Sequence, residues 1–165
     1  MRATIVSVLL LLTGALTASA QPESHERAAL RGVTAVGVVV EQLDAEVKGS
    51  DLTNEQIQAD VELRLRKAGI RVLDQSSVTL NYLYVNVNAV KANTETFYAV
   101  NIHVEFKRYG RFGVDKDAIN AFGSVWSKGT VGIVLLGNFK TSVRDHVGDY
   151  VDQFINDYLA ANPKQ

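Results

Sequence analysis

The sequence contains no cysteine. This absence excludes disulfide bonds, thiolate nucleophiles and cysteine metal ligands, and it removes the acylated cysteine that anchors bacterial lipoproteins. Small exported domains that cannot build a hydrophobic core usually carry disulfides. We therefore expect a well-packed domain that is stabilised by its core alone and is not lipid-anchored.

The chain also lacks an excess of charge of either sign. Lysine and arginine number 17 against 18 aspartate and glutamate residues. A protein that binds nucleic acid or anionic lipid shows a basic face or tail, which such a balance does not supply. We therefore expect neither nucleic acid nor a membrane surface as a partner.

Histidine is scarce, with three copies, and no His-Glu-x-x-His spacing occurs. Without cysteine, these histidines give little support for a transition-metal centre. Asp115 and Asp117 alternate as carboxylates do in calcium loops, but the glycine and the distal glutamate of an EF-hand are missing. No metal and no cofactor is expected.

Long apolar runs are missing as well, except for a short one near the start. Met1 to Ala20 has a positive beginning at Arg2, an apolar stretch over Ile5 to Leu12, and small residues before a cleavage point between Ala20 and Gln21. This pattern predicts a secretory signal peptide that is too short to span a membrane, for which ~20 apolar residues are needed. The expected mature chain is exported to the periplasm or secreted, is not inserted in a membrane, and has a charge of 16 − 18 = −2.

The remaining chain has the length of one domain. Residues 21–31 are polar without an apolar period, and they predict a flexible leader that includes His25. Residues 32–162 form the predicted domain, and residues 163–165 a tail. The valine-rich stretch over residues 33–43 predicts a strand that is covered on both faces and placed centrally.

A helix is predicted over residues 53–68. Thr53 and Gln56 have the spacing of a capping box, and Leu52 can pack against Ile57. Gly69 followed by Ile70 is typical of a helix that ends in a left-handed residue. A short strand over residues 70–73 is expected to follow.

Three further strands are predicted over residues 83–90, 98–107 and 121–134, where apolar and polar residues alternate. The polar stretch over residues 108–120 predicts a hairpin loop. A final helix is expected to begin at Thr141 or Ser142 and to end at Asn162-Pro163. The elements predict an α+β fold: a two-layer sandwich in which two amphipathic helices cover one face of a mainly antiparallel sheet of about five strands.

The uncovered face of this sheet is the candidate binding surface. Aromatic rings supply contact area and amides supply directed hydrogen bonds, which suits recognition of a peptide or a glycan. The expected ligand-binding residues are Tyr84, Asn86, Asn88, Asn101, His103 and Trp126. The alternative is that such side chains pair across the strands for stability alone.

His103 and Glu105 also share a strand face, and an imidazole next to a carboxylate could transfer a proton or bind a metal. A solvent-facing pair is the simpler interpretation, because any polar strand face produces such spacings. No Gly-x-Ser-x-Gly or Ser-x-x-Lys motif surrounds Ser124 and Ser127, so no nucleophile is marked.

Three segments carry a resemblance to known proteins. Residues 63–73, 84–87 and 151–159 are similar to a family of small exported bacterial proteins of unknown function. The step from helix through Gly69 to strand also resembles, at the level of fold, the α/β accessory domains of envelope proteins such as the amino-terminal domain of the Tol-system periplasmic propeller protein. The resemblance implies an exported envelope protein without enzymatic activity.

Three hypotheses follow. The first is a binding or adaptor domain of the bacterial envelope that holds a protein, a peptide or a glycan on the uncovered sheet face or at an exposed sheet edge. The second is a hydrolase or metal-dependent enzyme centred on His103 and Glu105. The third is a homo-oligomer joined through a free strand edge or through Leu63.

Overall fold

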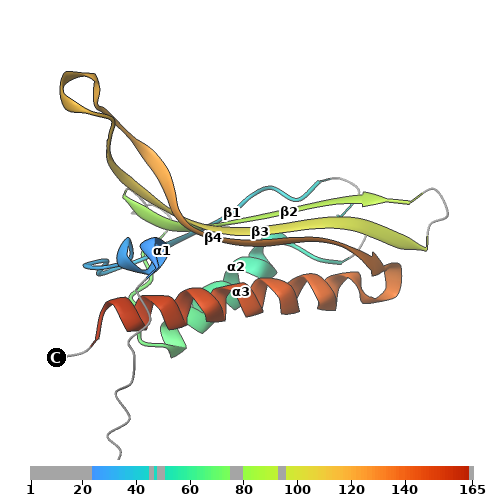
Figure 1. Ribbon diagram of the computed structural model, residues 1–165. Coiled ribbons are helices and arrows are strands. Elements are labelled where there is room, and N and C mark those ends of the chain that lie inside the picture. Colours follow the sequence, from blue (N-terminus) through green and yellow to red (C-terminus); the bar gives the residue numbers. More distant parts are fainter. Residues whose placement is uncertain (1–23, 45–46, 48–50, 75–79, 93–95, 164–165) are drawn as a thin grey trace, which may run out of the picture.

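A computed structural model describes residues 24–44, 47, 51–74, 80–92 and 96–163. The predicted signal peptide, its cleavage site at Ala20 and Gln21, and the last two residues lie outside the described residues. Figure 1 shows a sheet in one layer and the long helices in a second layer against one of its faces. Among the described residues, no helix is long and apolar enough to cross a membrane.

Within the described residues, the sheet has four strands in the order β1-β2-β3-β4. They are β1 (Gly37–Val40), β2 (Asn81–Lys91), β3 (Phe97–Phe112) and β4 (Ile119–Leu135). β1 runs parallel to β2, and the other neighbours are antiparallel. This arrangement confirms the α+β class, with one strand fewer than predicted.

The predicted fifth strand is reduced to a single bridge. Val36 exchanges backbone hydrogen bonds with Arg71 and Leu73, each of 2.9 Å, and the pairing extends no further. β1 therefore lies at an edge of the four-stranded sheet, whereas the sequence analysis placed it centrally. Val38 is nevertheless buried, and Val39 and Val40 are half-buried, which explains why the pattern of β1 is that of a covered strand.

α2 (Asn54–Lys67) begins and ends where its capping signals predict. The Thr53 side chain accepts a hydrogen bond of 3.2 Å from the Gln56 backbone N–H. At the other end, Gly69 has a φ of 78° and the Ile70 N–H donates to the Leu65 carbonyl at 3.0 Å. Both ends are therefore determined by local chemistry.

α3 (Phe139–Ala161) begins two residues before the predicted start at Thr141. Phe139 is buried and its ring lies 4.4 Å from that of Tyr98, so core packing extends the first turn. α3 contacts β3 and β4, and α2 contacts β1 and α3. The two helices thus cover the same face of the sheet (Figure 1).

Residues 24–31, expected to be a flexible leader, pack against the domain. The short helix α1 (His25–Ala28) contacts α3 and β4, and Leu30 is fully buried in the core. Arg27 pairs with Asp157 of α3 at 2.9 Å. One buried leucine and two ion pairs, Arg27 with Asp157 and Glu26 with Lys128, anchor a segment whose overall composition is polar.

The hairpin of β3 and β4 extends well beyond the sheet, as Figure 1 shows. We call residues 108–123 the arm. Pairing continues to Phe112 and Ile119, so strand replaces most of the predicted polar loop, and the short 3₁₀ turn η3 (Asp115–Asp117) forms the tip. At its base, Phe122 lies against the rings of Tyr82 and Tyr109, at 5.4 and 5.3 Å.

Trp126 lies on the helix-covered face of the sheet, although the sequence analysis placed it on the uncovered face. It is 1% exposed, pairs with the core residue Phe106, and lies 5.3 Å edge-on to Phe154. Beside this pair, a register shift at Phe106/Lys107 inserts Val125 as an extra residue. The more apolar set on β4, with Val131 and Ile133, consequently faces outward.

We predict that Trp126→Ala destabilises the fold rather than merely altering a surface. Loss of a buried tryptophan costs about 3–5 kcal/mol of the free energy of unfolding. Val114→Ala is the matched control, because Val114 is 76% exposed on the arm and its loss should cost no more than about 0.5 kcal/mol. Urea denaturation of both variants measures the difference, and equal stabilities would refute the placement of Trp126.

Candidate functional site

The open face, the side of the sheet away from α2 and α3, collects five of the six predicted ligand-binding residues. The register places Asn86 beside His103 and Asn88 beside Asn101. Tyr84 lies beside Glu105 on the same face. The strand alternation therefore brings these five side chains together, and only Trp126 is elsewhere.

One end of the open face is a polar network built around two carboxylates. Glu41, which follows β1, accepts hydrogen bonds from the Tyr84 hydroxyl and the Asn86 amide. Asn88 in turn donates to the Asn86 side-chain oxygen at 2.6 Å. Glu41 is not among the residues predicted from the sequence, and the signal for it is its position two residues after Val39 on the same strand face.

Glu105 is the second carboxylate. One of its oxygens lies 3.0 Å from His103 Nδ1 and the other 3.2 Å from Lys107 Nζ. Lys107 also lies 4.5 Å from the centre of the Tyr84 ring, where a cation is attracted to the aromatic face. Lys107 thus joins the two halves of the network, a role that sequence analysis did not assign.

The electrostatics of Glu41 and Tyr84 follow from their hydrogen bond. Donation from Tyr84, and then from Asn86, holds the pKa of the Glu41 carboxyl below its usual range. The same bond, together with partial burial, raises the pKa of Tyr84 to about 12. At neutral pH Glu41 is charged and Tyr84 is a neutral donor.

The pair of His103 and Glu105 is close enough to exchange a proton, and it borders a shallow hollow. The hollow has a volume of about 440 Å³ and is lined by Asn101, His103, Gly129, Thr130 and Val131. Gly129 makes room for the imidazole, because a Cβ there would lie 2.6 Å from His103 Cδ2. Within the described part of the chain, no three His, Asp or Glu residues are grouped as a metal site requires.

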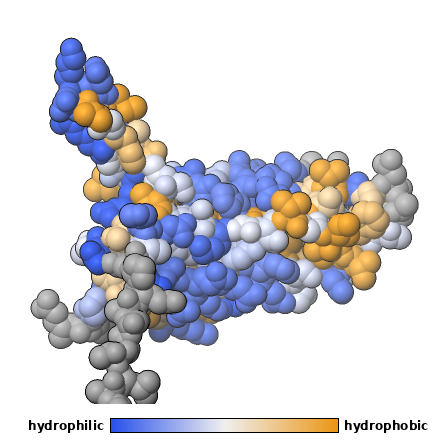
Figure 2. Space-filling view, viewed as in Figure 1, coloured by the Kyte–Doolittle hydropathy of each residue, from blue (hydrophilic) through white to orange (hydrophobic). Residues whose placement is uncertain are grey.

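The other end of the open face is apolar. We call its members the apolar patch: Val90, Ala99, Val131, Ile133 and Leu135. Ala99 pairs with Val90 on one side and Ile133 on the other, so the patch crosses β2, β3 and β4. Val90, Val131 and Ile133 are 65%, 79% and 72% exposed. Figure 2 shows apolar atoms gathered at this end of the sheet, opposite the arm.

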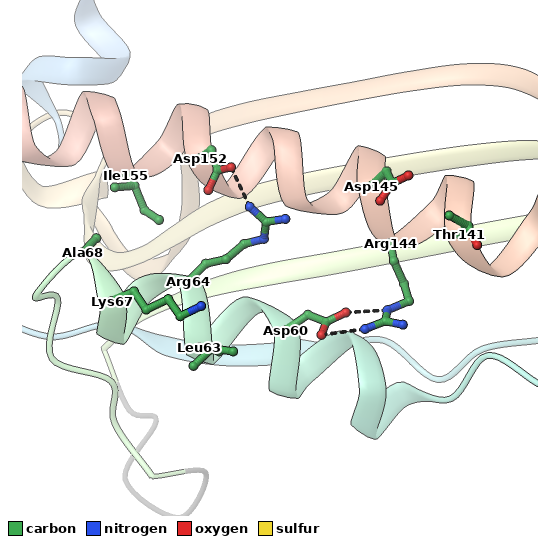
Figure 3. A pocket seen from close by; sticks show the side chains of 10 residues that line it. All are labelled: Asp60, Leu63, Arg64, Lys67, Ala68, Thr141, Arg144, Asp145, Asp152 and Ile155. Carbon is green, nitrogen blue, oxygen red and sulfur yellow. Dashed lines mark hydrogen bonds and ion pairs between the residues drawn. The ribbon is translucent and has the colours of Figure 1, made fainter.

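A groove between α2 and α3 lies on the far side of the molecule (Figure 3). Its volume is about 700 Å³. Its lining residues are Asp60, Leu63, Arg64, Lys67, Ala68, Thr141, Arg144, Asp145, Asp152 and Ile155. Three of these residues are basic and three are acidic, so the groove has no preferred sign of ligand charge.

Ion pairs cross this groove. Arg144 binds both oxygens of Asp60, at 2.6 and 2.9 Å, and this contact raises the pKa of Arg144. Arg64 reaches Asp152 at 2.6 Å over the surface of Gly148. Four of the six charged side chains of the groove thus pair with one another and hold the helices together, which favours a structural role.

We predict that Gly148 and Arg64 are energetically coupled. A Cβ at position 148 would lie 2.5 Å from Arg64 Nη2, so Gly148→Ala displaces the guanidinium from Asp152. Replacing a glycine inside a helix by alanine otherwise stabilises by about 1 kcal/mol. In an Arg64→Ala background, Gly148→Ala should raise the free energy of unfolding by this full amount, as measured by urea denaturation. In the wild-type background the same substitution should raise it by less. Equal gains in both backgrounds would contradict the contact.

We also predict that the Tyr84 hydroxyl ionises at a higher pH than an ordinary tyrosine. Its folded pKa of about 12 exceeds the unfolded value near 10, so the stability from its hydrogen bond is complete below pH 10 and is lost as the pH rises through 12. Tyrosinate absorbance, taken as the difference between wild type and Tyr84→Phe, isolates this group. Glu41→Ala should return the pKa of Tyr84 toward 10. A Tyr84 pKa near 10 in the wild-type protein would contradict the hydrogen bond between Tyr84 and Glu41.

No protein-family model and no curated protein matches the chain. Among solved structures, a minor lipoprotein from Acinetobacter baumannii is similar, with 10% sequence identity and a TM-score of 0.35. The match covers 78% of this chain and 95% of that chain. At this level the likeness carries no argument about function, and none of these comparisons supports the likeness to the Tol-system protein.

Proposed function

We propose that the protein is an exported binding or adaptor protein of the bacterial envelope that holds another protein on its open face. The observation that carries this proposal is the apolar patch. Single exposed apolar side chains are common on protein surfaces, but contiguous ones rimmed by polar groups mark interaction sites. Here the neighbouring strands present exposed aliphatic side chains as one surface.

The surroundings of the patch also suit a protein partner. Asn88 and Asn101 border it, and their amides can donate and accept hydrogen bonds. An apolar centre with a polar rim is the usual anatomy of a protein interface. Export is supported by the pattern of residues 1–20, which predicts a signal peptide.

The aromatic side chains of the face argue for a protein rather than a glycan. Trp126 is buried, and the Tyr84 hydroxyl is engaged by Glu41 while its ring is approached by Lys107. The two rings that were expected to supply contact area for a ligand, those of Tyr84 and Trp126, are therefore engaged within the chain. At the end of the open face away from the arm, the exposed side chains are aliphatic, and such a surface fits the side chains of another protein.

The same geometry favours binding over catalysis. Both oxygens of Glu105 are already held, one by His103 and one by Lys107. The hollow beside His103 is shallow, and the surrounding face is open to water. An acid or base catalyst works best in a site that excludes water, so we propose that the protein is not an enzyme.

The proposal is tested by photo-crosslinking in cells that express the full chain. A photoreactive phenylalanine derivative replaces Ala99, the exposed residue at the centre of the patch, and in a control it replaces Val114 on the arm. We expect a discrete adduct with an envelope protein from position 99 and none from position 114. Val90→Lys, which adds a charge within the patch, should reduce that adduct at least tenfold.

Two results would contradict the proposal. One is an adduct in which the crosslinked partner resists protease and is a glycan in place of a protein. The other is the same set of adducts from positions 99 and 114, which would mean that the patch has no selectivity. Circular dichroism of Val90→Lys serves as the control for folding, and no change is expected because Val90 is 65% exposed.

A further inference from the structure

The outer edge of β4 is the most conspicuous unpaired feature of the sheet. β4 is the last strand in the sheet order, so its side away from β3 has no neighbouring strand. Glu26 covers this edge at Ser127, whose backbone N–H donates to Glu26 Oε1 at 3.3 Å. Glu26 also pairs with Lys128 at 3.0 Å. Beyond Lys128, no segment among the described residues pairs with this edge.

Two hydrogen bonds show which backbone groups of β4 face outward. The Ser127 N–H points away from β3, to Glu26, whereas the Leu136 N–H points toward the β3 side, to the Thr96 carbonyl at 3.0 Å. The register between them is regular, because its one shift lies at Phe106/Lys107. Strand alternation therefore directs outward the N–H and C=O groups of residues 129, 131, 133 and 135.

This stretch has none of the usual protection of an edge strand. Residues 129–135 contain no charged side chain and no proline, and no bulge interrupts them. Natural sheets normally blunt such edges with lysine, proline, bulges or covering elements. A bare edge with outward backbone groups fits one kind of occupant, which is another β-strand.

Gly132, at the centre of residues 129–135, indicates where that second strand approaches. Gly132 has no positive φ, and a Cβ built on it would meet nothing within 4 Å. Nothing in the described chain therefore requires glycine there, in contrast to Gly129 beside His103. Glycine inside a strand weakens it, and it often marks a place where another backbone approaches closely.

We propose that two copies of this chain pair through β4, antiparallel, about a two-fold axis at Gly132. In this register Val131 lies opposite Ile133 of the second copy, and Gly129 lies opposite Leu135. All the outward backbone groups of residues 129–135 are then paired, because the free stretch is symmetric about residue 132. Twofold interfaces are self-complementary, and an uncharged edge meets its own copy without repulsion.

The pairing joins the two sheets into one and places the two apolar patches side by side. Val131 and Ile133 are both β-branched, and such pairs across antiparallel strands are stabilising. The inference goes beyond the proposed function and does not rest on it. It concerns the backbone edge of β4, whereas partner binding concerns the side chains of the open face.

The test begins with the mass of the purified protein, expressed from its full coding sequence. Size-exclusion chromatography with light scattering should give twice the chain mass at micromolar concentration. Val131→Lys adds the charge that blunts natural edges and should give the mass of one chain. Val90→Lys alters the same patch on β2, away from the edge, and should still give twice the chain mass.

The absence of cysteine allows the register to be tested directly. Residues 132 of the two copies form a non-hydrogen-bonded pair with Cα atoms about 4.5 Å apart, within the range of a disulfide. Gly132→Cys should form a covalent dimer on mild oxidation. Thr130→Cys should not, because position 130 lies opposite position 134 of the second copy.

Two results would overturn the inference. A single-chain mass for the wild type at all concentrations would show that the edge is unpaired. A dimer that survives Val131→Lys and is not trapped by Gly132→Cys would show that copies meet elsewhere, as through Leu63. In both cases the crosslinking result at position 99 would still decide the proposed function separately.

Discussion

Asp157 of α3 is the point at which α1 and β4 are joined to that helix. One of its oxygens accepts two hydrogen bonds from Arg27 of α1, at 3.0 and 2.9 Å, and the other accepts one from Trp126 Nε1 of β4, at 3.0 Å. The Trp126 ring packs on Phe154, one turn earlier on α3. This cluster holds β4 against the helix with its tryptophan inward, and much of the remaining surface follows from that orientation.

Once Trp126 faces the helices, alternation along β4 leaves Val131, Ile133 and Leu135 on the opposite side. The open face is thereby divided. Toward the arm it carries a polar network whose members bind one another, and at the far end it carries an apolar patch with no partner among the described residues. The polar network, whose side chains bind one another, stabilises the sheet. The apolar patch is the half of the open face that is available to another molecule.

The parts of this structure that are predictable from sequence are those determined by neighbouring residues. The ends of α2 follow from Thr53 and Gly69, and the alternation of β2 and β3 is sufficient to place Tyr84, Asn86 and His103 on one face. Contacts distant in sequence decide the rest. The bulge beside Phe106 and the bond from Trp126 to Asp157 orient β4 against its hydrophobic pattern, and the patch was missed for the same reason.

Other differences have the same origin. Leu30 lies in a segment of polar composition, yet it is fully buried because α1 is held against α3 by Arg27. The arm is rich in glycine and charge, but Phe112 packs over Gly123 and lets the strands continue. Glycine beside an aromatic ring can support a strand in place of ending it.

The orientation of β4 is the central claim, and the emission of Trp126 tests it most directly because the chain has one tryptophan. With the indole 1% exposed, its fluorescence should be blue-shifted and little affected by acrylamide in the native protein, and it should become red-shifted and quenched on unfolding in urea. Emission at the wavelength of a solvated indole, with full quenching of the native protein, would place Trp126 on the open face and contradict this account.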